Sequence, residues 1–121
     1  MTRTLVVKCT VGAEENIERC NQAFTVATTA LAAGAQVSLW LTGEASWLAV
    51  PGRPEQVELP QAAPLAELRD LVLATGTLTV CTQCAGRREL TEADLVPGAR
   101  IAGSASFVEQ ILREDVQALV Y

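Results

Sequence analysis

The sequence contains no histidine, and aromatic residues make up only 4% of its 121 residues. The absence of histidine removes the most frequent general base, a frequent metal ligand and the side chain that most often senses pH. Half of the residues are apolar. With so few aromatic rings, a core has to be built from alanine, valine and leucine, and such small side chains suit helices packed closely on a sheet.

Basic residues are also scarce: nine lysines and arginines face 14 acidic residues, giving a formal net charge of −5. Nucleic-acid binding requires a basic face, so this balance argues against it. No stretch approaches the roughly 18–20 apolar residues that a membrane-spanning helix needs. The apolar run before Lys8 is too short for a signal peptide. We therefore expect a cytoplasmic protein, with reduced thiols and with neither a membrane nor a nucleic acid as partner.

Strand and helix patterns alternate along the chain, and its length predicts one domain over residues 1–121. Strands are predicted at 4–9, 36–41, 77–80, 99–102 and 115–120. Helices are predicted at 13–33 and 64–75, from the cysteines at 81–84, and at 105–113. Residues 42–49 are expected to form a loop or one short helical turn. This order favours an α/β fold with a mostly parallel five-stranded sheet that is covered on both faces.

Local signals predict where the helices begin and end. Glu14 and Glu15 are expected in the first turn of the first helix, where the helix dipole favours acidic residues. Gly34 is expected to end that helix. Ser104 is expected to cap the last helix, and Thr91 is expected to cap a helical turn with Asp94.

In a parallel sheet, reactive groups gather at the carboxyl ends of the strands. Cys9, Gly43 and Cys81 each lie at or just after such an end, so we expect them on one rim of the sheet. Cys9 is expected to be buried there, and Cys20 is expected on the apolar stripe of the first helix. Trp47 has two open interpretations: it lines a cleft or a subunit contact, or it packs beneath the loop at 51–54.

The most informative segment runs from Thr77 through Cys81-Thr-Gln-Cys84 to the adjacent Arg87 and Arg88. A short strand leads directly into Cys-x-x-Cys, which begins a helix. The N–H groups at a helix start favour a thiolate over a thiol. The two arginines favour a thiolate further or bind an anionic partner. Alternatively, they are solvated charges that pair with acidic residues at 89 and 92.

The cysteine pair has four interpretations: a thioredoxin-type redox pair, half of a zinc site, inert buried cysteines, or a nucleophilic thiol that carries sulfur. A zinc site lacks a second ligand pair, because Cys9 and Cys20 lie on a strand and a helix and histidine is absent. We therefore predict no metal site and no cofactor. We favour the sulfur-carrying thiol, which suits a helix start, adjacent positive charge and a reducing compartment.

Three stretches of the sequence resemble the DsrE/DsrF-like family of small sulfur-relay proteins, which includes DsrE, TusD and YchN-like proteins. These stretches are the opening strand with its Ala-rich helix (5–33), the segment from strand to loop at 37–48, and the cysteine segment at 80–88. The cysteine segment is the most specific of the three, because the family carries a cysteine at this turn with arginines one to two turns later.

The resemblance implies a three-layer α/β/α fold and assembly into homotrimers or homohexamers. It also implies that Cys81, which matches the family cysteine by its spacing to the arginines, takes a persulfide from a donor protein and passes it to an acceptor protein. Cys84 matches an additional cysteine of unassigned role. Two alternatives stay open: a non-catalytic oligomeric module that binds a small ligand or partner, and a dithiol–disulfide oxidoreductase. The mean hydropathy of +0.25 independently favours a homo-oligomer.

Overall fold

The computed structural model describes residues 3–121 of the chain. Within these residues, five strands form one parallel sheet in the order β4-β3-β2-β1-β5. The strands are β1 (Thr4–Cys9), β2 (Gln36–Leu41), β3 (Thr77–Cys81), β4 (Arg100–Ala102) and β5 (Val116–Val120). The helices are α1 (Ile17–Ala32), α2 (Leu65–Thr75), α3 (Thr82–Arg87) and α4 (Ser104–Ile111), with short 3-10 helices η1 (Gly43–Ala49), η2 (Pro54–Gln56) and η3 (Glu92–Asp94).

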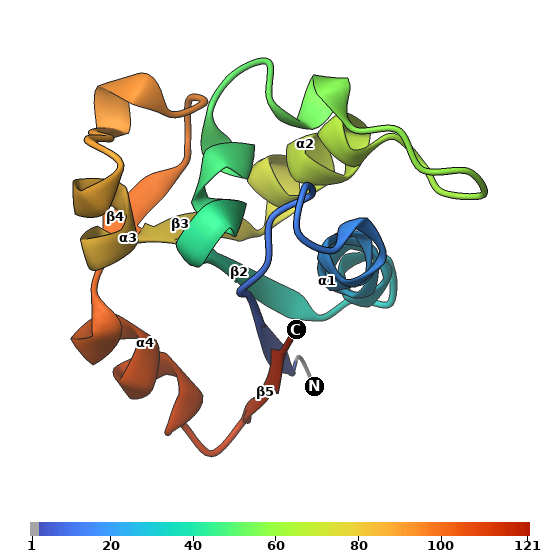
Figure 1. Ribbon diagram of the computed structural model, residues 1–121. Helices are drawn as coiled ribbons and strands as arrows, with labels where there is room; N and C mark the ends of the chain where they lie inside the picture. Colours follow the sequence, from blue (N-terminus) through green and yellow to red (C-terminus); the bar gives the residue numbers. More distant parts are fainter. Residues whose placement is uncertain (1–2) are drawn as a thin grey trace.

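The sheet lies between helices on both faces (Figure 1). Alternate residues of β2 point to opposite faces, so Leu39 joins the core beneath α1 and α2, whereas Trp40 faces α4. The Trp40 ring meets the edge of Phe107 at 5.3 Å between centroids, and its Nε1 donates to Gln110 at 3.1 Å. The predicted α/β fold with three layers is therefore confirmed.

The two helical layers bury very different amounts of their surface. Helix α1 buries Cys20, Ala23, Phe24 and Ala27 against the sheet, which fits a core of small side chains. Helix α4 has no buried residue among those described, and three large apolar side chains on this side of the sheet are exposed. These are Val108 (45% exposed), Leu112 (76%) and Val120 (64%). An apolar surface therefore remains on α4 and β5.

Two predicted helix starts are wrong. Helix α1 begins at Ile17, because the Asn16 side chain accepts a hydrogen bond from the N–H of Arg19 and so caps the helix. Glu15 instead accepts from the N–H of Gly12 at 2.8 Å, so the turn at 12–15 precedes the helix. Helix α4 already includes Ser104, with Gly103 at the cap position. The predicted turn at Thr91 is confirmed, since Asp94 accepts from the Thr91 N–H at 2.8 Å.

Arg69 fastens the loop around η2 to helix α2. Its guanidinium donates two hydrogen bonds to the Glu55 carboxylate, at 3.1 and 3.0 Å, and one to Asp70 at 3.0 Å. Arg69 is only 6% exposed, although both carboxylates reach solvent. The hydrogen bond from Arg69 lowers the pKa of Glu55 below its usual range. This bidentate pair therefore contributes to stability at neutral pH.

We expect Arg69→Ala to lower the free energy of unfolding by about 2 kcal/mol at pH 7, less than a fully buried pair loses because the carboxylates are half exposed. Since the pKa of Glu55 is depressed in the folded state, its contribution is present above the unfolded pKa and is lost as pH falls through the folded pKa. The difference in unfolding free energy between the wild type and the variant should therefore become smaller below about pH 4. Urea unfolding at several pH values measures this difference. Arg100→Ala, which removes an exposed arginine, is the control. A gap that is constant with pH would contradict the ionic origin.

Candidate functional site

The two cysteines of the Cys-x-x-Cys motif lie at the carboxyl end of β3. Cys81 is the last residue of the strand, pairs in register with Ala102 of β4 and occupies the cap position of α3. Cys84 lies one turn into the helix. Neither cysteine forms a disulfide, and both are partly exposed. The motif therefore lies where the sequence predicts it, at the carboxyl-end edge of the sheet.

Helix α3 is short. It contains six residues, so few aligned peptide groups contribute to the field at its start. A more specific donor lies across the rim: the N–H of Gly43 points at the Cys84 Sγ at 3.2 Å. Gly43 has a left-handed φ of 57°, and a Cβ there would lie 3.2 Å from the carbonyl oxygen of Thr10. Glycine therefore suits this close approach of η1 to α3.

Arg88 joins α3 to η1. Its Nη1 donates to the carbonyl oxygen of Cys84 at 3.0 Å, and its Nε and Nη2 donate to Glu44 Oε2 at 2.9 and 2.7 Å. The predicted alternative of pairing with Glu89 or Glu92 is wrong, because Glu92 accepts instead from the N–H of Ile101. Arg87 is exposed and forms no ion pair within residues 3–121.

Glu44 is the site residue that sequence reasoning missed. Its carboxylate accepts from both Arg88 nitrogens and from Trp47 Nε1, which lies at 3.1 Å. The hydrogen bond from Arg88 lowers the pKa of Glu44, so the group is ionised at neutral pH. The Glu44 Cβ packs so closely on Gly12 that a Cβ on this glycine would lie 2.8 Å away. Glu44 thus connects the turn at residues 12–15, helix η1 and helix α3.

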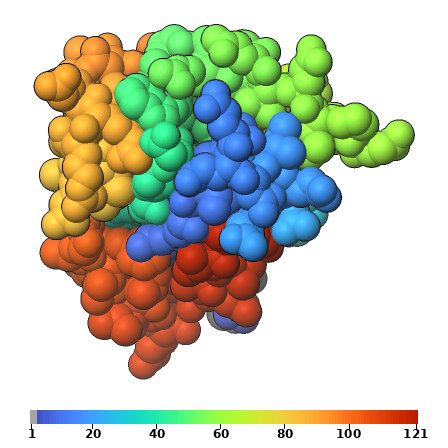
Figure 2. Space-filling model, viewed as in Figure 1, coloured from blue at the N-terminus to red at the C-terminus, as the bar shows by residue number. Residues whose placement is uncertain are grey.

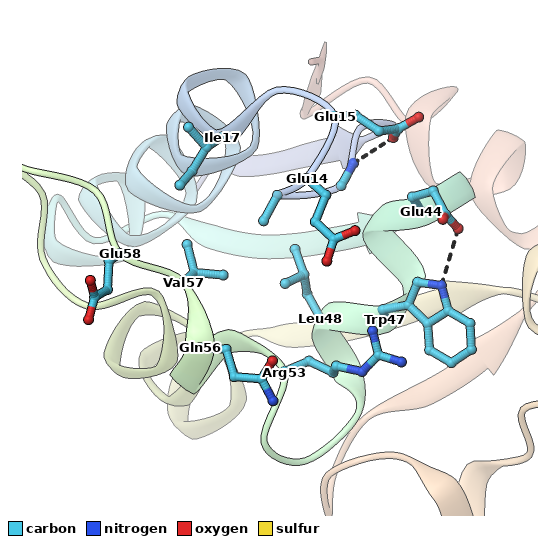
Figure 3. A pocket seen from close by; sticks show the side chains of 12 residues that line it. Glu14, Glu15, Ile17, Glu44, Trp47, Leu48, Arg53, Gln56, Val57 and Glu58 are labelled. Atoms are coloured by element: carbon cyan, nitrogen blue, oxygen red, sulfur yellow. Dashed lines mark hydrogen bonds between the residues drawn. The ribbon is translucent and has the colours of Figure 1, made fainter.

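A cavity of about 660 Å³ opens beside Glu44 (Figure 3). Trp47 lines it, and the Arg53 guanidinium stacks over the indole at 4.5 Å from the ring centroid. Four carboxylates and one guanidinium supply the charge of the lining, and the Glu14 side chain points toward the centre. Ile17, Leu48 and Val57 add apolar surface. The interpretation of Trp47 as a cleft residue therefore matches its position, although it also contacts the loop at 51–54.

The other two cysteines form a separate buried pair. Cys9 is fully buried at the end of β1, where its Sγ donates to the carbonyl oxygen of Val11 at 3.3 Å. Its neighbour Cys20 is also fully buried, and the hydrogen bond with Cys9, together with burial, raises the pKa of Cys20. The structure therefore does not bring Cys9 to the open part of the rim with Cys81 and Cys84.

A membrane-spanning helix and a metal-binding cluster are both absent from residues 3–121. No helix within residues 3–121 combines the length and the apolar character required to cross a bilayer. In the same residues, no three cysteine or acidic side chains cluster in a way that would hold a metal ion.

Comparison with known proteins fits this geometry. The model of the DsrE/DsrF-like family matches residues 8–117, from β1 into β5. The chain belongs to the DsrE/DsrF-like family. Its fold is similar to that of the ychN protein from E. coli, with a TM-score of 0.71 at 15% identity and full coverage of both chains. MTH1491 from Methanobacterium thermoautotrophicum, described as a protein of unknown function, is similar at a TM-score of 0.62 and 8% identity, again over both full chains.

No curated protein matches the sequence. The identities to the two solved structures are low, so these structures show the DsrE-like fold alone. Family membership indicates a function of the sulfur-relay type, and proteins of this family generally work with sulfur-transfer partners. The roles of the individual cysteines in this family member are argued below from the geometry of the rim.

Proposed function

We propose that this protein is a sulfur carrier in which Cys81 accepts sulfur from a donor protein as a persulfide and passes it to an acceptor protein. One observation carries the proposal. Among the four cysteines, which all lie in the described part of the chain, Cys81 alone is partly exposed and free of a hydrogen bond. Cys9 and Cys20 are buried together, and Cys84 is held by Gly43. The proposal requires a reducing compartment such as the cytoplasm, where a thiol stays available.

The transfer step balances without a further reactant. The Cys81 thiolate attacks the outer sulfur of a donor persulfide, the sulfur–sulfur bond of the donor breaks, and the donor leaves as a thiolate. A persulfide then remains on Cys81, and the proton of the donor persulfide moves with the transferred sulfur. The reverse reaction with an acceptor thiolate restores Cys81.

Cys84 is proposed as a second thiol that resolves or protects this persulfide. If Cys84 attacks the inner sulfur, a Cys81–Cys84 disulfide forms and hydrosulfide leaves, which also discards the cargo. A protein that instead cycles between this disulfide and the dithiol at a cytosolic potential, without carrying sulfur, would be the dithiol–disulfide oxidoreductase. The two functions differ in whether sulfur is retained.

Whole-protein mass spectrometry tests the proposal directly. After incubation with glutathione persulfide and removal of the reagent, the wild-type protein should gain the mass of one sulfur atom per chain. The gain should map to the peptide that contains Cys81, and dithiothreitol should reverse it. A wild-type protein that stays unmodified would refute the carrier function.

A binding module is the second candidate function, and the cavity beside Trp47 supports it. Its volume of about 660 Å³ lies in the range of small-ligand sites. Its acidic lining favours a ligand or peptide side chain of positive charge. Thiol reactivity separates the two functions: if Cys81 alkylates no faster than a model thiol in the folded protein, the binding module gains support and the carrier loses it.

We also propose that the protein assembles into a homotrimer or homohexamer. The exposed apolar side chains Val108, Leu112 and Val120 on α4 and β5 support this, because monomers rarely leave such a surface uncovered. We expect static light scattering at micromolar concentration to report a multiple of the 12.8 kDa chain mass. A monomer under these conditions would contradict the assembly.

A further inference from the structure

A polar chain of contacts connects Cys84 to helix η1 at two places. The first is the hydrogen bond from the Gly43 N–H to the Cys84 Sγ. The second passes through Arg88, which binds the carbonyl oxygen of Cys84 and the carboxylate of Glu44. Glu44 directly follows Gly43 in the chain, and Arg88 lies one helical turn after Cys84. The ion pair therefore constrains the same two segments that the N–H···S contact joins. We call the pair of Glu44 and Arg88 the clamp.

The surroundings hold the clamp in a defined geometry. The Arg88 side chain is only 18% exposed, so it is more constrained than a typical surface arginine. Trp47 donates to the same Glu44 oxygen, and Gly12 leaves room for the Glu44 Cβ. Figure 2 shows η1 as a green-teal band between the blue N-terminal turn and the yellow-orange region of α3. The clamp thus lies at a junction of three segments.

We infer that Glu44 and Arg88 are positioning residues for Cys84, because their ion pair keeps the Gly43 N–H on the Cys84 Sγ. A donor aimed at sulfur interacts more strongly with an anionic sulfur than with a neutral thiol. The clamp therefore holds the Cys84 sulfur in one orientation beside η1. The role of Cys84 in sulfur transfer rests on the proposed function, whereas the positioning itself is measurable on Cys84 alone.

The test uses Cys81→Ser as the background, because Cys84 is then the partly exposed thiol while Cys9 and Cys20 remain buried. Within it, Arg88→Ala removes the clamp, and Glu44→Gln removes the negative charge of the clamp with almost no change in size. Arg87→Ala is the matched control, since Arg87 is the adjacent, exposed arginine without an ion pair among residues 3–121. Circular dichroism verifies that each variant is folded.

Two measurements report on the inference. Breaking the clamp should move the Gly43 amide resonance upfield in nitrogen–proton NMR spectra, as the hydrogen bond to sulfur is lost. It should also slow the alkylation of Cys84 by iodoacetamide at pH 7 by about tenfold, because a charge-assisted hydrogen bond is lost. Arg87→Ala should change neither value. Arg88→Lys, which keeps the charge, should restore part of both, a rescue that a merely structural role would not predict.

The pH dependence gives a third readout. The charged groups that face Glu44 are Arg88 and Arg53, with Glu14 and Glu15 sharing the cavity wall. Because Arg88 lowers the pKa of Glu44, the clamp should persist at neutral pH and open as pH falls through that depressed value. The Gly43 amide should follow this titration in the protein with Glu44 and should not follow it in Glu44→Gln.

Each outcome bears on the inference. An unchanged Gly43 resonance in Arg88→Ala would overturn it, and so would an equal effect in Arg87→Ala. Faster alkylation without the clamp would also overturn it, since Arg88 would then act as a screen over the thiol. If the wild-type protein fails to load sulfur while the Gly43 and alkylation results hold, the carrier function falls and the positioning role stands.

Discussion

Replacing Cys81 by serine is expected to remove most of the gain of sulfur mass after exposure to a persulfide donor. A serine hydroxyl of similar size keeps the packing at the end of β3, but it does not form a stable bond to sulfane sulfur under these conditions. The loss should therefore not depend on a change in fold, and any sulfur that remains should be the share that Cys84 accepts. The measurement is whole-protein mass spectrometry, with unfolding curves of both proteins as the check on stability.

Cys84→Ser provides the matched control. Cys84 lies one turn away on the same helix and is also partly exposed, so a general effect of removing a thiol at the rim would appear in both variants. We expect Cys84→Ser to load one sulfur atom. If Cys84 resolves the persulfide in the wild type, the persulfide should survive longer in Cys84→Ser than in the wild-type protein. Loading of Cys81→Ser to the level of Cys84→Ser would contradict Cys81 as the acceptor.

Replacing Trp40 by alanine is expected to cost about 3–5 kcal/mol of unfolding free energy. Trp40 is 1% exposed and connects the centre of the sheet to α4 through Phe107 and Gln110. Helix α4 buries no residue completely, so this contact contributes a large share of what holds it on the sheet. The variant leaves a cavity, and the Gln110 amide oxygen keeps only the hydrogen bond from Ser38.

The second tryptophan of the chain is the control. Trp47 is partly exposed, and its contacts with Glu44 and Arg53 lie at the surface of the cavity. We expect Trp47→Ala to change the unfolding free energy by less than about 1 kcal/mol. Urea unfolding followed by circular dichroism compares the two variants. Similar losses for both would show that α4 is held mainly by other contacts.

The fold was largely predictable because its signals are local. Each strand is a short apolar run, and the strands alternate with segments of helical spacing, which favours a parallel sheet. The observed start of α1 differs from the predicted one because a turn precedes the helix. Glu15 satisfies the N–H of Gly12 in a turn, and the side chain that caps the helix is Asn16. Acidic residues near a helix start do not distinguish these two arrangements.

The site was only partly predictable because its decisive contacts join distant segments. The sequence placed Gly43 and the cysteine pair on one rim, and the structure brings Gly43 to Cys84. The partner of Arg88 was missed because Glu44 is 44 residues away along the chain, whereas Glu89 and Glu92 are its sequence neighbours. Periodicity and motif spacing carry no information about such a pair until the strand order is known.

The order of the strands also affects how the sheet can form during synthesis of the chain. Strand β5 pairs with β1, so Val116 is opposite Thr4 across nearly the whole length of the chain. Translation releases β1 first and β5 after the other four strands, which leaves one edge of β1 open on the nascent polypeptide. An open apolar edge invites pairing with other chains. Synthesis of β5, rather than the formation of α1 and α2, is then the step that closes this edge of β1.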